Sequence, residues 1–478
     1  MNKRKKTAGA VLAASLFAAL AITSFANADG NKEKLPNMLR SVNANGVDAT
    51  FSTAGFIDLT NPFFQSLGTN GRSCASCHVP SEGWTITPKG VQARFDKSQG
   101  TDPIFRLNDG ANSPKADVST VDNRRKAYSM LLSRGNIRVG IGIPANSEFD
   151  LVQADDPYGF ASAKELSLFR RPMPSTNLKF LSGVMWDGRE TFTDANSKDC
   201  LFGTTTCFAP IHFDLAHQSN EATAGHAQSA QPLTAQQREA IVNFEMGLFT
   251  AQVEDHHAGN LAARGARGGP EMLKDQVYYF GINDTVVGDY RTHAAFNPNA
   301  MSLYKAWNRY MPDSSGRNAH LGRLAIARGE ALFNGKPIQI RNVKGLNDDL
   351  NAANIPGTCT TCHNAPNSGN HSIPMPLDIG ISDASRRTPD MPLYTLRNKV
   401  TGETIKTTDP GRALLTGKWK DIGRFKGPVL RSLSSRAPYF HDGSAKDLKE
   451  VVEFYNTRFG IGFTNEEMRD LIAFLSAL

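Results

Sequence analysis

The chain has 478 residues, too many for one ordinary core and suited to two or three domains. Of its formal net charge of +7, the basic N-terminal stretch at residues 3–6 supplies four charges, which leaves +3 for the rest. No basic block with interleaved aromatic residues remains, so nucleic-acid binding and polybasic membrane binding are disfavoured.

The N-terminus is predicted to be a targeting segment. Basic MNKRKK is followed by a small, apolar run from Ala8 to Ser24 and by Ala26-Asn27-Ala28, a pattern typical of a signal peptidase site. We expect a signal peptide over residues 1–28, cleaved near Ala28, and a periplasmic mature chain. An uncleaved anchor is the alternative; no later stretch is long and apolar enough for a second span, so no stable membrane insertion is expected after cleavage.

Two CxxCH motifs use four of the six cysteines. The first lies in GRSCASCHVP at 71–80, and the second lies in GTCTTCHN at 357–364. Between them, Cys200 and Cys207 stand seven residues apart in DCLFGTTTCF. Because exported chains meet oxidising surroundings, we expect a structural disulfide there, with two free buried thiols as the alternative.

Four helices are predicted, in chain order over 235–252, 319–334, 447–456 and 465–478. In the first, Ile241, Phe244, Leu248 and Phe249 share a face, and Thr234 begins a capping box. Asn465 or Thr464 would cap the last helix. Few stretches alternate with a period of two, so the sequence predicts an all-α fold with long loops.

Three kinds of site share the CxxCH spacing. A redox dithiol needs a thioredoxin-like βαβ context, which is not visible, and zinc needs four ligands from nearby pairs, whereas these two pairs lie far apart in the chain. Covalent c-type haem needs only two thiols three positions apart and the adjacent histidine. We therefore predict two covalent haem c groups. They would be held by Cys74, Cys77, Cys359 and Cys362, with His78 and His363 as proximal iron ligands.

The motifs divide the chain into two cytochrome c-like haem domains. The N-terminal domain would span 29–256 and the C-terminal domain 317–478, with 257–316 as a linker rich in Gly, Asn and Arg. The first half is too long for a minimal haem domain, so we expect insertions, at 95–170 and 195–215.

Several longer strings carry a family resemblance. They are VMWDGRE at 184–190, FNG…CTTCHNAP at 333–366, FKGPVLRSLSSRAPYFHDGS at 425–444 and EVVEFYN at 450–456. With both CxxCH sites, they resemble the bacterial dihaem cytochrome c peroxidase family, and within it the MauG-like branch. The resemblance implies that the N-terminal haem meets peroxide and that the C-terminal haem stores or relays an electron.

The resemblance also implies a second ligand for the C-terminal haem. Most family members place a methionine there and MauG-like members a tyrosine, and the matching position is Tyr455. A phenolate favours Fe(III), whereas a methionine raises the reduction potential. The alternatives are that Tyr455 only packs its helix, or that Met375 or Met391 is the ligand.

The far side of the N-terminal haem is expected to be open. Many relatives place a blocking histidine soon after the first CxxCH, but no histidine occurs here between His78 and His212. The family pattern implies Gln218 as the glutamine that orients peroxide, and Gln228 stands where the acid–base glutamate is expected. We therefore take His226 as the acid–base group. The alternatives are Glu221, or that both are surface residues of an ordinary helix.

Two further positions follow from the resemblance. Trp186 matches the tryptophan that relays an electron between the haems, although simple core packing is the alternative. Family members also bind calcium between the two domains, through an Asn side chain and backbone oxygens, here those of Arg436 and Pro438. The resemblance therefore implies one calcium ion, although Pro172 stands in the place of the Asn and leaves the site one side-chain ligand short. His441 and Asp442 would fix the same loop by hydrogen bonds.

The predicted function is a dihaem c-type peroxidase that reduces hydrogen peroxide. Its electrons would come from a small redox protein, such as a cytochrome c or a cupredoxin. A MauG-like oxidase that modifies a partner protein, a non-enzymatic electron-transfer cytochrome and an oxygenase that binds O₂ at the open haem stay open as alternatives. The sequence predicts no oligomeric state.

Overall fold

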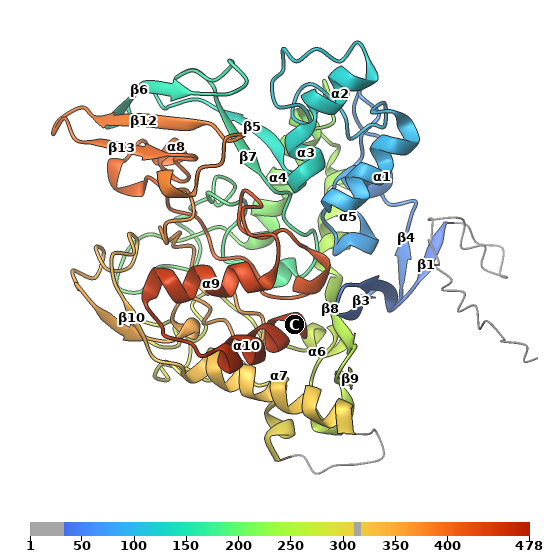
Figure 1. The fold of residues 1–478 in the computed structure, drawn as a ribbon, viewed down its shortest axis with the longest axis vertical. Helices are drawn as coiled ribbons and strands as arrows, with labels where there is room; N and C mark the ends of the chain where they lie inside the picture. Colours follow the sequence, from blue (N-terminus) through green and yellow to red (C-terminus); the bar gives the residue numbers. More distant parts are fainter. Residues whose placement is uncertain (1–32, 310–316) are drawn as a thin grey trace, which may run out of the picture.

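The computed structural model describes residues 33–309 and 317–478, and the signal peptide predicted for residues 1–28 lies outside these ranges. Within them, short helices and strands are joined by long loops (Figure 1). The helices are α1 (Pro88–Ser98), α2 (Val121–Ala127), α3 (Ser129–Arg134), α4 (Ile211–Gly225), α5 (Ala235–Met246), α6 (Pro270–Lys274), α7 (Arg317–Gly335), α8 (Ala413–Thr416), α9 (Leu448–Phe459) and α10 (Asn465–Ser476).

The prediction of an all-α fold is wrong, because the described residues also form five small sheets. The pairings are β1-β4, β10-β11, β5-β7, β13-β12-β6 and β2-β3-β8-β9. The strands are β1 (Lys34–Pro36), β2 (Leu39–Asn43), β3 (Gly46–Ser52), β4 (Phe56–Asp58), β5 (Ile137–Ile141), β6 (Phe149–Asp155), β7 (Leu166–Arg170), β8 (Leu248–Asp255), β9 (Gly259–Asn260), β10 (Ile338–Ile340), β11 (Ile355–Gly357), β12 (Leu393–Asn398) and β13 (Thr404–Thr407). The architecture is therefore mixed α/β.

These strands lack the alternating pattern for physical reasons. All five residues of β7 are buried, so the strand has no solvent face on which polar residues would recur. β3 is buried at five of its seven positions, including the polar Asp48 and Thr50. Several other strands have only two or three residues, which is too short for any period to show.

The helix predicted over 235–252 is correct only in its first part. Its capping box at Thr234 is present, but α5 ends at Met246. From Leu248 the chain continues as β8, which pairs antiparallel with β3. Leu248 and Phe249 are buried there as strand residues, because a short apolar run suits a buried strand as well as a helix face.

The three other predicted helices are confirmed as α7, α9 and α10, with small shifts of their ends. Thr464 is the cap of α10, and its hydroxyl accepts the backbone N–H of Glu467. The three helices lie together in the lower half of Figure 1. They enclose an apolar core with Tyr304, Trp307 and Phe474 at its centre.

The sheet β13-β12-β6 connects the two halves of the chain. β12 belongs to the C-terminal half (317–478) and pairs antiparallel with β6 of the N-terminal half (29–256). Phe149 and Leu168 of the first half share a buried cluster with Tyr394 and Leu396 of the second. The division into two haem domains with a linker at 257–316 stays a prediction.

The predicted disulfide between Cys200 and Cys207 is present. It closes a loop whose Phe202 packs against Tyr290, with ring centroids 5.8 Å apart. The ring of Phe208, just after the bridge, stacks on Phe280. The bridge therefore holds this loop of the N-terminal half against the segment 257–316.

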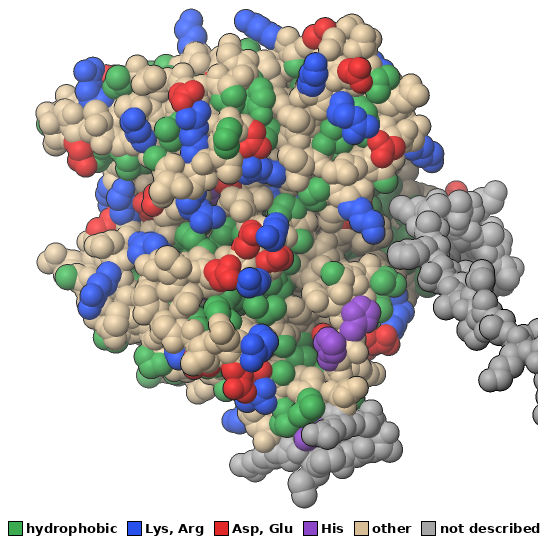
Figure 2. Space-filling model, viewed as in Figure 1, with side chains coloured by type: hydrophobic (Ala, Val, Ile, Leu, Met, Phe, Trp, Pro, Cys, Tyr) green, Lys and Arg blue, Asp and Glu red, His purple; other side chains and the backbone are tan. Residues whose placement is uncertain are grey.

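The outer surface carries both signs of charge. On the face shown in Figure 2, Lys and Arg side chains are intermixed with Asp and Glu side chains. Over the ranges that the structure describes, none of the helices combines the length and the apolar character needed to cross a membrane.

Candidate haem-binding and active site

The two CxxCH motifs fold in the same way. The first forms the 3-10 turn Cys74–Ser76, closed by reciprocal hydrogen bonds between Ser73 and Ser76. The backbone N–H of His78 donates to the carbonyl of Cys74 at 3.0 Å. Each turn thus begins at a residue whose hydroxyl caps it and ends at the histidine.

The second motif repeats this arrangement with different capping residues. Thr358 and Thr361 close the 3-10 turn Cys359–Thr361. The backbone N–H of His363 donates to the carbonyl of Cys359 at 3.1 Å. Because all four cysteines and both histidines line one cavity, the two turns present their thiols and imidazoles to the same interior space.

Both histidines are oriented by backbone carbonyls. Nδ1 of His78 lies 3.1 Å from the carbonyl oxygen of Trp84, and Nδ1 of His363 lies 2.6 Å from that of Gly369. A hydrogen bond from Nδ1 leaves Nε2 as the metal-binding atom. Burial lowers the pKa of both imidazoles to about 4, so both are neutral at physiological pH, as iron ligation requires.

Strand β3 supports the contact between His78 and the carbonyl of Trp84. The indole Nε1 of Trp84 donates to the hydroxyl of Thr50 in β3 at 2.8 Å, and the Trp84 ring is fully buried. The sheet β2-β3-β8-β9, which sequence analysis missed, thereby fixes the carbonyl that orients His78.

None of the four motif cysteines takes part in a disulfide. Burial raises the pKa of all four, to about 12 for Cys359 and Cys362, so they are protonated at neutral pH. Within the described ranges, no three His, Cys, Asp or Glu side chains gather as a metal site. The thiols therefore suit thioether attachment.

The cavity fits haem in its lining as well as in its thiols. It has a volume of about 410 Å³. Its walls include Leu178, Val184 and Leu215 in the first half and Ile338 and Ile340 in the second. Such apolar walls suit a porphyrin face.

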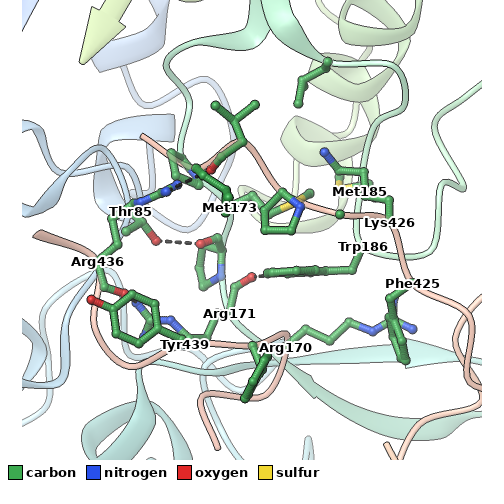
Figure 3. A pocket seen from close by; sticks show the side chains of 18 of the residues that line it. Thr85, Arg170, Arg171, Met173, Met185, Trp186, Phe425, Lys426, Arg436 and Tyr439 are labelled. Carbon is green, nitrogen blue, oxygen red and sulfur yellow. Dashed lines mark hydrogen bonds between the residues drawn. The ribbon is translucent and has the colours of Figure 1, made fainter. Parts of the chain in front are cut away.

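Two buried basic side chains also face the cavity. Lys426 and Arg436 line it, and both are shown in Figure 3. Burial lowers the pKa of Lys426 to about 7 and that of Arg436 to about 10. Cations at the edge of an apolar cavity can pair with the propionates of haem.

Tyr455 lies on the cavity wall, on α9. Burial is the main cause that raises the pKa of its phenol, and nearby Cys362 and Cys359 raise it further. The alternative ligands lie elsewhere: Met391 is buried against Met130 and Phe169, and neither it nor Met375 lines the cavity. Of the three candidates, only Tyr455 shares the cavity with the second CxxCH turn.

On the side of the first motif, the structure brings Gln218 and His226 to the cavity. Gln218 lies on α4, and His226 is the residue at which that helix ends. Glu221 is exposed on the same helix and does not line the cavity. Of the two acid–base candidates, only His226 reaches the predicted haem site.

Two residues that sequence analysis missed hold His226 in place. Its Nδ1 lies 2.5 Å from Oδ2 of Asp109, and Asp109 forms a buried ion pair with Arg72 through its other oxygen. Burial would raise the pKa of Asp109, but its hydrogen bond with His226 and the charges of His226 and Arg72 lower it below its usual value. Asp109 is therefore a carboxylate that accepts from His226.

Trp186 also lines the cavity (Figure 3). Its Nε1 donates to the carbonyl of Arg171 at 2.8 Å, and its own carbonyl accepts the backbone N–H of Lys426 at 2.8 Å. The VMWDGRE and FKGP strings are thus hydrogen-bonded side by side. Trp186 occupies a wall shared by the two haem-attachment turns.

A buried ion network anchors the loop after Trp186. Arg170 contacts Asp409 through Nε at 2.7 Å and Asp187 through Nη1 at 2.5 Å. Burial would raise the pKa of Asp187, but the charges of Arg170 and Arg189 lower it to about 2. His441 lies beside this network, and its ring stacks on Phe425 with centroids 4.2 Å apart.

The residues predicted for calcium do not fit that ion here. The carbonyl of Arg436 accepts a hydrogen bond from the guanidinium of Arg171 at 3.3 Å. The position expected to hold an Asn side chain is Pro172, whose carbonyl accepts the hydroxyl of Thr85 at 2.6 Å. A cationic side chain thus occupies an oxygen that calcium would need.

The two CxxCH turns on one cavity place the protein in the class of c-type haem proteins. Sequence comparison narrows that class, although no family model matches the chain. Cytochrome-c peroxidase IdrP1 of Pseudomonas sp. (strain SCT) is 30% identical over 171 residues, which cover 32% of this chain and 39% of that protein. For cytochrome-c peroxidase IdrP2 of Denitromonas iodatirespirans, the identity is 26% over 190 residues, 38% of this chain and 49% of that protein.

Cytochrome c551 peroxidase of Nitrosomonas europaea is 30% identical over 121 residues, 25% of this chain and 30% of that protein. The chain thus spans less than half the length of each of these relatives. Among solved structures, a MauG-like protein associated with microbial copper homeostasis aligns over 87% of each chain at 15% identity, with a TM-score of 0.35. Part of this chain is thus similar in sequence to bacterial cytochrome-c peroxidases, the proteins that its motifs resemble.

Proposed function

We propose that the protein is a periplasmic dihaem c-type peroxidase that reduces hydrogen peroxide to water. The peroxide-reducing haem would be attached at Cys74 and Cys77 and ligated by His78. The second haem, attached at Cys359 and Cys362 and ligated by His363 and Tyr455, would relay or store an electron. The main support is that two CxxCH turns face one buried cavity which also contains Trp186, Gln218 and His226.

The chain's own residues would handle the protons. Haem iron, when bound, would supply the electrons that break the O–O bond. His226 would accept a proton from peroxide at Nε2, because Asp109 engages Nδ1. The same imidazole then returns that proton to the departing oxygen, so that two electrons and two further protons yield two water molecules. Gln218, about two turns before His226 on α4, would hold the peroxide by hydrogen bonding.

Trp186 would carry electrons between the two haems. Its indole lies in the shared cavity, and its N–H is fixed by the carbonyl of Arg171. The external electrons would come from a small redox protein, a cytochrome c or a cupredoxin.

The test uses holo-protein exported with its haems. We expect a pyridine haemochrome assay to give two haems per chain and reduced cytochrome c to be oxidised in proportion to added peroxide. The ferric protein should react with peroxide without prior reduction, because no histidine between residues 78 and 212 is available to block the first iron. A haem content far below two per chain would refute the proposal.

The second candidate is a MauG-like oxidase that modifies a partner protein, and the place of Tyr455 in the cavity favours it. The two candidates share the reaction with peroxide and differ in its outcome. Rapid spectral change with peroxide but no turnover of reduced cytochrome c or cupredoxin would select the modifying oxidase. No spectral change at all would leave an electron-transfer cytochrome.

A further inference from the structure

The guanidinium of Arg171 is buried among backbone carbonyls where the two halves of the chain meet. Its Nη1 donates to the carbonyl oxygen of Arg134 at 2.5 Å, and its Nη2 donates to those of Ile86 at 2.7 Å and Arg436 at 3.3 Å. The residue is only 5% exposed. Ile86 and Arg134 belong to the N-terminal half and Arg436 to the C-terminal half, so one side chain bridges both.

The surroundings are shaped for this side chain. Gly135 has a left-handed backbone (φ +65°), and a Cβ built there would lie 2.4 Å from Nη1 of Arg171. The backbone N–H of Arg171 donates to the carbonyl of His441 at 2.6 Å, which adds a second link to the C-terminal half. Its carbonyl accepts the indole N–H of Trp186. The position of Arg171 is therefore fixed from several sides.

This site carries positive charge at physiological pH. An arginine side chain is protonated at physiological pH, so the buried guanidinium of Arg171 is a cation among these carbonyls. Arg171, Arg436 and Tyr439 lie together at one edge of the cavity (Figure 3). Because the guanidinium of Arg436 also lines this part of the cavity, a divalent ion here would meet two like charges.

Calcium takes about 6–8 oxygen ligands at roughly 2.3–2.6 Å. Here the carbonyl of Arg436 already binds Arg171, and Pro172 offers no side-chain oxygen. A guanidinium satisfies carbonyl oxygens from several segments with one positive charge, as a metal ion does. We infer that the guanidinium of Arg171 takes the place of the calcium ion expected between the two halves, so that the protein joins them without a metal.

The first experiment measures calcium and stability in native holo-protein. The expected result is less than stoichiometric calcium by elemental analysis after gel filtration. The melting temperature should be the same in excess EGTA and in millimolar calcium chloride. One calcium per chain, together with a lower melting temperature in EGTA, would overturn the inference. Neither readout involves peroxide, so failure here is distinct from failure of the proposed peroxidase function.

The second experiment replaces the cation. Arg171→Gln keeps a polar side chain but removes the charge and most donors, and it should lower the melting temperature by about 5 °C or more. Arg171→Lys keeps the positive charge on one ammonium group and should recover part of the lost melting temperature. Arg40→Gln, at a half-exposed arginine of β2, is the control and should melt like the native protein. An Arg171→Gln protein as stable as the native one would also overturn the inference. If that variant does not fold, the calcium measurement on the native protein still decides.

Discussion

Nδ1 of His226 and Oδ2 of Asp109 lie 2.5 Å apart at the wall of the cavity, although 117 positions separate the two residues in the chain. A carboxylate that accepts from Nδ1 holds the imidazole in one tautomer and leaves Nε2 to exchange protons. Arg72, paired with the same carboxylate, keeps Asp109 in place. His226 lies two positions before Gln228, the residue at which the family pattern leads one to expect a glutamate.

His226→Gln should slow the bimolecular reaction with peroxide by roughly 10²-fold or more, because a positioned acid–base group is lost. Asp109→Asn should slow it less, since the imidazole remains but its tautomer is no longer fixed. Stopped-flow spectroscopy of the ferric holo-protein measures both rates. Glu221→Gln, on the exposed side of the same helix, is the matched control and should react at the native rate. A native rate in His226→Gln, or a large loss in Glu221→Gln, would reverse the assignment.

Tyr455→Met should raise the reduction potential of the second haem, because a thioether favours Fe(II) where a phenolate favours Fe(III). The expected shift is on the order of 0.2 V, within the roughly 0.8 V that axial ligands span. Spectroelectrochemical titration of the holo-protein measures it. Tyr439→Phe removes another cavity-wall hydroxyl, which donates to the carbonyl of Leu433, and should leave the potential unchanged. An unaltered potential and optical spectrum in Tyr455→Met would remove Tyr455 as a ligand.

Trp186→Phe should keep the apolar wall of the cavity but slow electron transfer between the haems. We expect a loss of roughly tenfold or more, equivalent to about 1.4 kcal/mol in the barrier. Rapid-mixing spectroscopy that follows each haem after peroxide addition provides the measurement. Trp419→Phe is the matched control, because Trp419 packs on Phe149 and does not line the cavity. Equal rates in the two variants would show that Trp186 only fills space.

Sequence reasoning succeeded where the chemistry is local. A CxxCH turn, a capping box and a seven-residue disulfide loop each depend on residues a few positions apart, and each is present. Sequence reasoning failed where contacts between distant segments determine the local structure. The chain leaves the helical path at Gly247 because β3 offers β8 a partner, and no pattern within 235–252 encodes that partner.

The same limit explains the residues that were missed at the site. Asp109 has no motif of its own and gains its role only when the fold brings it to His226. Arg171 is one of two adjacent arginines, and its sequence gives no sign that Ile86, Arg134 and Arg436 would surround it with carbonyls.

Asp48 gives a prediction about stability and pH. It lies in β3, and its carboxylate accepts the hydroxyls of Ser432 at 2.7 Å and Ser435 at 2.5 Å, in the string RSLSSRAP of the C-terminal half. Burial raises its pKa to about 6, although both serines and the charge of Arg436 act in the opposite direction. The folded protein therefore binds this proton more tightly than the unfolded chain does.

The sign of the effect follows from linkage. The stabilising contribution of the protonated form is complete below the unfolded pKa near 3.8 and is lost as pH rises through about 6. The difference amounts to about 3 kcal/mol between acidic and neutral pH. Asp48→Asn keeps an oxygen that can accept from the serines but cannot ionise. It should melt about 3 °C above the native protein at pH 7.5 and close to it at pH 4.5. The measurement is thermal unfolding of both holo-proteins across this range, with Asp96→Asn on the exposed side of α1 as the control. A constant difference between variant and native protein at every pH would mean that Asp48 does not titrate in this window.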